Sequence, residues 1–124
     1  LHNWMKGGYE APALAAFFKA LKPGGILGME DHRGRTDIAQ DPQANNGYVR
    51  QDYAIALAQK AGFEFIGASE IDANPKDTKD HPFGVWTLPP VRRSAEKGDD
   101  AKFDHSKYDA IGESDRMTLK FVKP

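Results

Sequence analysis

The stretch that most limits what this chain can fold into runs from residue 13 to residue 33 and reads ALAAFFKALKPGGILGMEDHR. Its first part places apolar side chains at helical spacing, so that they share one face of a helix. The Lys-Pro-Gly-Gly turn ends that helix, because proline cannot continue it and glycine accepts the left-handed exit. Residues 26–29 are short, continuous and apolar, which is typical of a strand covered on both faces.

Four ionisable residues follow this strand directly: Glu30, Asp31, His32 and Arg33. In open α/β sheets, ligands bind just beyond the carboxyl ends of the strands. His32 is the candidate catalytic base because imidazole titrates near neutrality, and Asp31 is the candidate catalytic partner that orients it. Arg33 can hold an anionic group of a substrate. The alternative is a solvated loop start, in which Asp31 and Arg33 simply pair at the surface.

The remaining pattern predicts helices separated by strands, which favours a parallel α/β sheet. No crossover helix is evident before the last predicted strand, where Met117, Leu119 and Phe121 alternate with polar neighbours, so we expect this strand to be antiparallel. The predicted elements are a strand exit over 1–8, helices over 9–21 and 47–61, strands over 25–30, 63–71 and 116–122, a packed loop or short edge strand over 82–90, and a charged excursion over 91–115 with a short helix near 100–108.

Composition excludes several classes of function. The 124 residues suit one domain, and a net charge of −1 argues against binding to nucleic acid or to an anionic membrane surface. No apolar run approaches the roughly 20 residues that span a bilayer. The absence of cysteine excludes disulfides and thiolate chemistry and is compatible with a cytoplasmic protein. The four histidines share no metal-ligand spacing, so we expect no metal site.

These elements resemble the second half of class I S-adenosylmethionine-dependent methyltransferases. The resemblance rests on the Lys-Pro-Gly-Gly turn before an acid-ended strand, on the helix and strand that follow, and on residues 111–119 and 81–86, which look like a bacterial subgroup of such enzymes. It implies the C-terminal half of a Rossmann-like methyltransferase fold, a mostly parallel sheet whose antiparallel last strand inserts between the two before it. Residues 1–124 would form a single domain, the C-terminal part of a longer one.

The same resemblance makes residues 1–4 similar to the exit of the family's fourth strand. It implies that His2, Asn3 and Trp4 line the cofactor site. The alternative for Trp4 is a core or interface aromatic, which burial statistics for large aromatic side chains favour. Trp86 is the candidate substrate-binding lid, with a packed loop anchor as its alternative. The chain departs from the family in lacking the Gly-rich turn and the acidic residue that hold S-adenosylmethionine.

We therefore expect methyl transfer from S-adenosylmethionine to an unknown small molecule, carried out by the intact protein, while this segment alone is inactive. The alternative is a non-catalytic α/β interaction module that self-associates. In either case an uncovered sheet edge favours a homo-oligomer, because unpaired strand edges recruit other strands.

Overall fold

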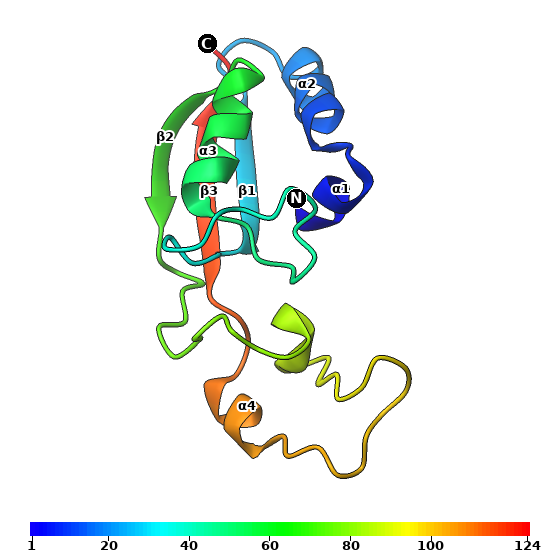
Figure 1. Cartoon of the computed structure of the whole chain (residues 1–124). Coiled ribbons are helices and arrows are strands. Elements are labelled where there is room, and N and C mark those ends of the chain that lie inside the picture. Colours follow the sequence, from blue (N-terminus) through cyan, green and yellow to red (C-terminus); the bar gives the residue numbers. More distant parts are fainter.

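The sheet of this protein has three strands, in the order β1-β3-β2. A computed structural model describes all residues, 1–124, and its strands are β1 (Ile26–His32), β2 (Glu64–Ser69) and β3 (Arg116–Val122). β3 lies between the other two and is antiparallel to both, as Figure 1 shows. The bounds predicted for the last strand and its antiparallel direction are confirmed.

The predicted mostly parallel, Rossmann-like sheet is wrong. No two neighbouring strands pair in parallel, and the chain forms a small mixed α/β domain whose sheet is antiparallel throughout. The reason lies in how the chain connects its strands. β1 and β2, which a helix separates in the sequence, run in the same direction but do not pair with each other. β3 lies between them and forms backbone hydrogen bonds with both.

Residues 1–8 form a helix and not the predicted strand exit. The backbone N–H groups of Trp4 and Met5 both donate to the carbonyl of Leu1, which starts a helical turn, and Met5 is buried in the core. The helices are α1 (His2–Gly7), α2 (Glu10–Ala20), α3 (Gln51–Lys60), a 3-10 turn η1 (Gly84–Thr87) and α4 (Ser106–Ile111). None of these helices has the length and apolar content that a membrane-spanning helix needs.

The second predicted helix starts later than its sequence pattern indicated. Residue Val49 is held in extended conformation instead, because its N–H donates to His32 and its carbonyl accepts from Gly34, just beyond β1. Helix α3 therefore begins at Gln51. The turn that precedes it is consequently fixed against the end of β1, where the candidate residues lie.

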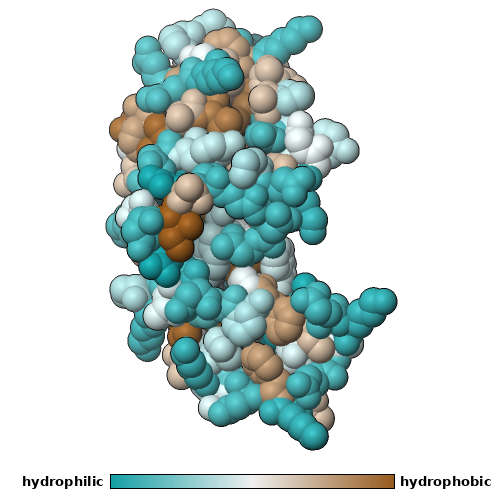
Figure 2. Space-filling model, viewed as in Figure 1, coloured by the Kyte–Doolittle hydropathy of each residue, from teal (hydrophilic) through white to brown (hydrophobic).

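The core lies on one face of the sheet, under helices α1 to α3. Met117, Leu119 and Phe121 of β3 are at most 1% exposed and pack with apolar side chains from the helices. The opposite face of the sheet is open, and Ile26 and Ile66 are about half exposed there. In Figure 2, apolar residues gather over the upper and the lower parts of the molecule, with mostly hydrophilic residues between them.

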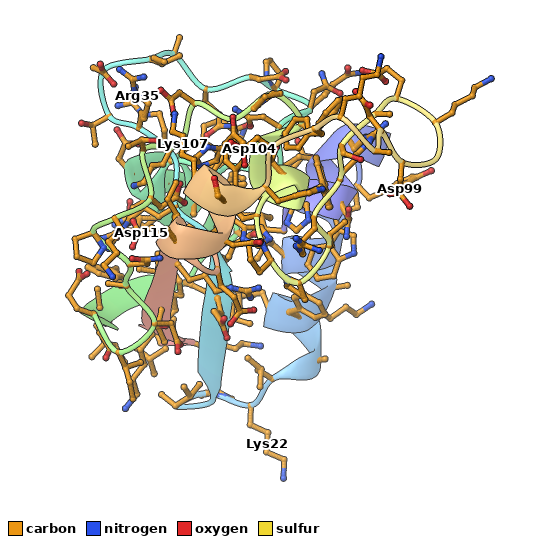
Figure 3. The ribbon with its side chains drawn as sticks, turned by 90° about the horizontal axis from the view of Figure 1, so that it is seen from below. Lys22, Arg35, Asp99, Asp104, Lys107 and Asp115 are labelled. Atoms are coloured by element: carbon orange, nitrogen blue, oxygen red, sulfur yellow. The ribbon has the colours of Figure 1, made fainter.

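Residues 70–115 form an excursion that links β2 to β3 and extends below the sheet (Figure 1). The 82–90 segment is the predicted packed loop, with Val85, Thr87 and Leu88 buried in it. A short helix was predicted near 100–108, but α4 begins only at Ser106 and overlaps that range at its end. Seen from below in Figure 3, Asp99 of the excursion and Lys22 of the turn before β1 both extend outward, and both are exposed.

Candidate functional site

Asp31 organises a polar cluster at the end of β1. The alternation of the strand turns this residue toward the covered face, where it is 3% exposed. One carboxylate oxygen accepts the backbone N–H of His2 at 2.8 Å, and the other accepts Nδ1–H of His2 at 2.7 Å and the backbone N–H of His32 at 2.8 Å. Burial alone would raise the pKa of the Asp31 carboxyl, but the hydrogen bond from His2 holds it well below its usual range.

His32 faces this cluster from the last position of β1. Its Nδ1 is hydrogen-bonded to Ser114 Oγ at 2.5 Å, and its ring centroid lies 5.0 Å from that of His2. Burial lowers the pKa of His32 to about 4; the nearby Asp31 charge opposes this shift, while Arg116 and His2 add to it. The imidazole is therefore neutral at pH 7, the protonation state that a proton acceptor requires.

Asp31 orients His2, whereas we predicted that it would orient His32. The carboxylate accepts the backbone N–H of His32, and the only hydrogen-bond partner of the His32 ring is Ser114 Oγ. A carboxylate that accepts Nδ1–H fixes the imidazole tautomer and leaves Nε2 as a hydrogen-bond acceptor. The cluster thus presents a second candidate proton acceptor, His2, which sequence reasoning had assigned to the cofactor.

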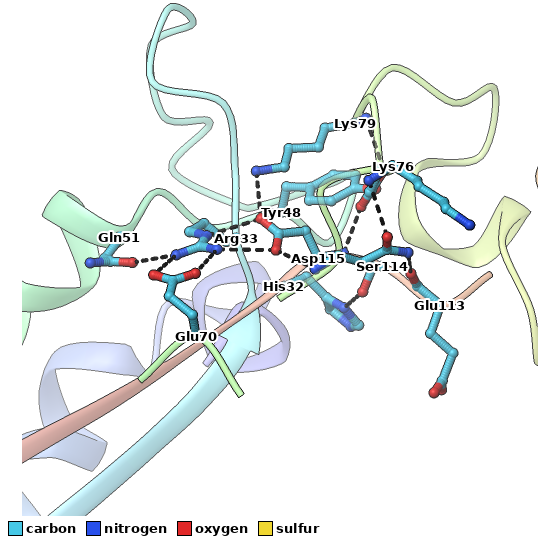
Figure 4. A network of polar contacts seen from close by, with 12 residues as sticks. His32, Arg33, Tyr48, Gln51, Glu70, Lys76, Lys79, Glu113, Ser114 and Asp115 are labelled. Atoms are coloured by element: carbon cyan, nitrogen blue, oxygen red, sulfur yellow. Dashed lines mark hydrogen bonds and ion pairs between the residues drawn. The ribbon is translucent and has the colours of Figure 1, made fainter. Parts of the chain in front are cut away.

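Arg33 lies in a separate ion-pair network, drawn in Figure 4. All five of its N–H groups donate, to Asp115, Glu70 and Gln51, at 2.7 to 3.1 Å. These hydrogen bonds, first those to Glu70 and then those to Asp115, raise the pKa of the guanidinium. The predicted surface pairing of Asp31 with Arg33 does not form. A role for Arg33 in holding a substrate anion stays a prediction, and it requires Glu70, whose side chain is 66% exposed, to swing away.

A buried carboxylate that sequence reasoning missed, Asp77, fastens the excursion beneath the cluster. It accepts hydrogen bonds from the hydroxyl of Tyr48 at 2.8 Å, from Nε2 of His81 at 2.7 Å and from the backbone N–H of Asp115 at 2.9 Å. Burial, and then the bond to Asp77, raises the pKa of the Tyr48 phenol. The Tyr48 ring lies 6.5 Å from the His32 ring, so this buried network supports the cluster from below.

The excursion also brings Trp86 to the cluster, with its ring centroid 6.2 Å from that of His2. Asn3 and Trp4 do not join it. Helix positions two apart point about 200° from one another, and the Trp4 ring accordingly packs on Phe17, on the other side of α1. The three residues predicted to line the cofactor site therefore form no common surface, and the chain shows no cradle that fits S-adenosylmethionine.

A polar hollow of about 490 Å³ opens beside Ser114, the partner of His32. Its lining is charged and hydrogen-bonding, and it holds room for a small polar molecule. The residues that line it are Glu30, Asp72, Ala73, Asn74, Glu113, Ser114 and Arg116.

His2, Asp31 and His32 are the residues that could hold a metal ion, because one ligand atom from each lies within 4.8 Å of the others. Sequence spacing could not indicate this group, since α1 and β1 bring its members together over 29 positions. Both oxygens of Asp31 already accept N–H donors, so a metal ion would have to displace hydrogen bonds that the chain itself makes. This geometry describes a hydrogen-bonded cluster better than a metal cage.

No family model, curated protein or solved structure matches this chain.

Proposed function

We propose that this chain supplies the acceptor-activating side of an S-adenosylmethionine-dependent methyl transfer to a small molecule. The observation that carries the proposal is the neutral imidazole of His32, held by Ser114 at the end of β1 beside the His2–Asp31 pair. The position of β3 between two helix-separated strands adds support, since the family resemblance implied that arrangement for the last strand.

S-adenosylmethionine, when bound, supplies a methyl group that is already activated on a sulfonium. The protein then needs to align the acceptor and to take its proton. In the tautomer in which His32 Nδ1 donates to Ser114 Oγ, Nε2 carries a free lone pair for that proton. The hollow beside Ser114 gives a small acceptor a place within reach of this cluster. We place the reaction in the cytoplasm, in keeping with the absence of cysteine.

The test compares wild type with His32→Gln in two measurements, each made on the intact protein, because we expect this segment alone to be inactive. Calorimetric titration with S-adenosylmethionine reports cofactor binding, and transfer of a labelled methyl group to a panel of small hydroxyl and amine acceptors reports turnover. We expect His32→Gln to lower turnover about 100-fold or more, the usual contribution of a general base, and to leave cofactor binding unchanged. Unchanged turnover in the variant would remove His32 from the mechanism, and cofactor binding by neither protein would favour the second candidate.

The second candidate is a self-associating interaction module. It is favoured by the outer edge of β1, where no backbone hydrogen bond joins residues 26–31 to any segment other than β3. This strand contains no lysine, proline or bulge, three of the features that keep sheet edges from pairing, and its only acidic residues, Glu30 and Asp31, lie near its end. The partner that such an edge fits is a second copy of the same strand, and the mass of the protein in solution tests it.

A further inference from the structure

A second cavity, of about 340 Å³, lies between the turn before α3 and the excursion. Its lining combines aromatic rings with hydrogen-bonding groups, chiefly Asn46, His81, Phe83, Trp86, Arg93 and Glu96. None of these residues contacts His32, so the cavity is distinct from the hollow beside Ser114.

Two glycines allow the segments that form the walls of this cavity to approach each other closely. Gly84 has φ +58°, and a Cβ on it would lie 2.2 Å from the carbonyl oxygen of Asn46. Gly47 has φ +81°, and its Cβ would lie 2.5 Å from a methyl group of Val85. The N–H of Val85 also donates to the Asn46 carbonyl at 3.0 Å. The shape of the cavity is therefore fixed before any ligand arrives, which reduces the entropy cost of binding.

Arg93 offers unused hydrogen-bond donors at this cavity. Its backbone N–H donates to Trp86, and its guanidinium lies over the Phe83 ring with Cζ 5.1 Å from the centroid. Nε and Nη2 donate to the carbonyls of Ala95 and Glu96, and Nη2 also pairs with the Glu96 carboxylate at 3.4 Å. Nη1 makes no hydrogen bond within the chain, so its two N–H groups are free for a carboxylate oxygen.

His81 contributes a buried polar atom that has no partner. Its side chain is 1% exposed, and Nε2 is bound to Asp77 at 2.7 Å. Nδ1 is buried without a hydrogen bond, and the nearest carboxylate oxygen, from Asp80, is 3.8 Å away. Such atoms are rare in folded proteins, because leaving one unsatisfied is costly. The bond to Asp77 nevertheless holds the His81 ring in place as part of the cavity wall.

We propose that this cavity binds a small aromatic carboxylate. The ring lies against Phe83 and Trp86, and the carboxylate meets Nη1 of Arg93. Flat aromatic walls favour a planar ligand, and the free guanidinium edge selects its negative charge. The inference does not rest on the proposed methyl transfer, because binding here needs neither His32 nor S-adenosylmethionine.

Benzoate is the probe, and a Trp4→Phe background makes Trp86 the only tryptophan, so that its fluorescence reports the cavity alone. We expect a saturable fluorescence change with benzoate and none with benzyl alcohol, which lacks the charge. Arg93→Gln should weaken benzoate binding about tenfold or more, the effect of losing a charge-assisted hydrogen bond. The matched control is Arg92→Gln, because Arg92 is exposed and pairs with Asp109 outside the cavity.

Amide shifts of the lining residues in a benzoate-titrated NMR spectrum give a second readout, which also confirms that the variants are folded. The proposal is overturned if benzoate up to about 10 mM moves neither the fluorescence nor these amides, since that range exceeds the Kd of even a weak small ligand. Equal weakening by Arg93→Gln and Arg92→Gln would overturn it as well, because binding would then follow overall charge and not this cavity.

Discussion

A single buried carboxylate sets the chemistry of two histidines at the end of β1. Asp31 accepts Nδ1–H from His2 and thereby fixes its tautomer. It contacts His32 only through the backbone, and burial keeps the His32 ring neutral, with Arg116 and His2 adding to that effect. Two neighbouring imidazoles are thus prepared in different ways. These local contacts decide which nitrogen can take a proton, and burial makes the charge of His32 depend on folding.

The lowered pKa of His32 makes the stability of the protein depend on pH. The unfolded chain takes up a proton below about 6.5 and the folded chain only below about 4, so stability is greatest above pH 6.5 and falls as the pH drops toward 4. With allowance for solvent screening, we expect a loss on the order of 2 kcal/mol. Urea unfolding at pH 7 and pH 4.5 measures it, and His32→Gln, which binds no proton, should show a smaller loss than wild type.

Equal losses in the two proteins would contradict this prediction, since His32 would then titrate alike in the folded and unfolded states. The comparison stays above pH 4 to keep the effect of Asp31 out of it. Because folding lowers the pKa of Asp31, its contribution to stability is lost only at a pH low enough to protonate this carboxylate in the unfolded chain.

At the scale of elements, close backbone contact between the turn before α3 and η1 positions Trp86 and the second cavity. Gly84→Ala would place a Cβ against the Asn46 carbonyl and also strain a positive φ. We expect it to lower the free energy of unfolding by about 2–5 kcal/mol. The control is Gly98→Ala, at φ +65° with nothing within 4 Å of the new Cβ, which should cost only about 1–2 kcal/mol. Denaturant unfolding of both variants measures the difference, and equal costs would show that the contact is absent.

The local sequence pattern predicted those elements whose buried face can be recognised from the spacing of their own apolar residues. The alternation of Met117, Leu119 and Phe121 gave β3 its bounds, and the apolar face before the Lys-Pro-Gly-Gly turn predicted α2. Strand order is not local information, and nothing in the sequence of β1 or β2 states that β3 separates them. Residues 1–8 were misread because a short helix, held by the burial of Met5, carries little periodicity of its own.

The candidate site likewise has residues that the sequence indicated and contacts that it could not indicate. His32 could be chosen from its position after a strand, and Trp86 from its place in an apolar loop. The pairing of His2 with Asp31, the bond from Ser114 to His32 and the buried Asp77 join residues 29 to 82 positions apart, which no spacing rule relates. These contacts are set by the packing of the excursion and of α1 against the end of the sheet.

At the scale of the whole molecule, the open outer edge of β1 is the feature most prone to self-association. We expect a homo-oligomer by light scattering coupled to size exclusion, and we expect Gly28→Lys to shift it toward monomer, since an added lysine opposes edge pairing. Gly67→Lys on β2 is the control, because a Cβ meets nothing within 4 Å at either glycine. A monomer at high concentration in the wild type, or equal effects of the two variants, would exclude pairing through β1.

The neutral imidazole of His32 at the end of β1 is central to the function proposed for this chain. An NMR titration of the histidine ring resonances, assigned by comparison with His32→Gln, measures its protonation directly. We predict that His32 titrates with a pKa of about 4. A value at or above 6.5 would show an exposed, readily protonated ring, and would contradict both the cluster geometry and the role of His32 as the proton acceptor.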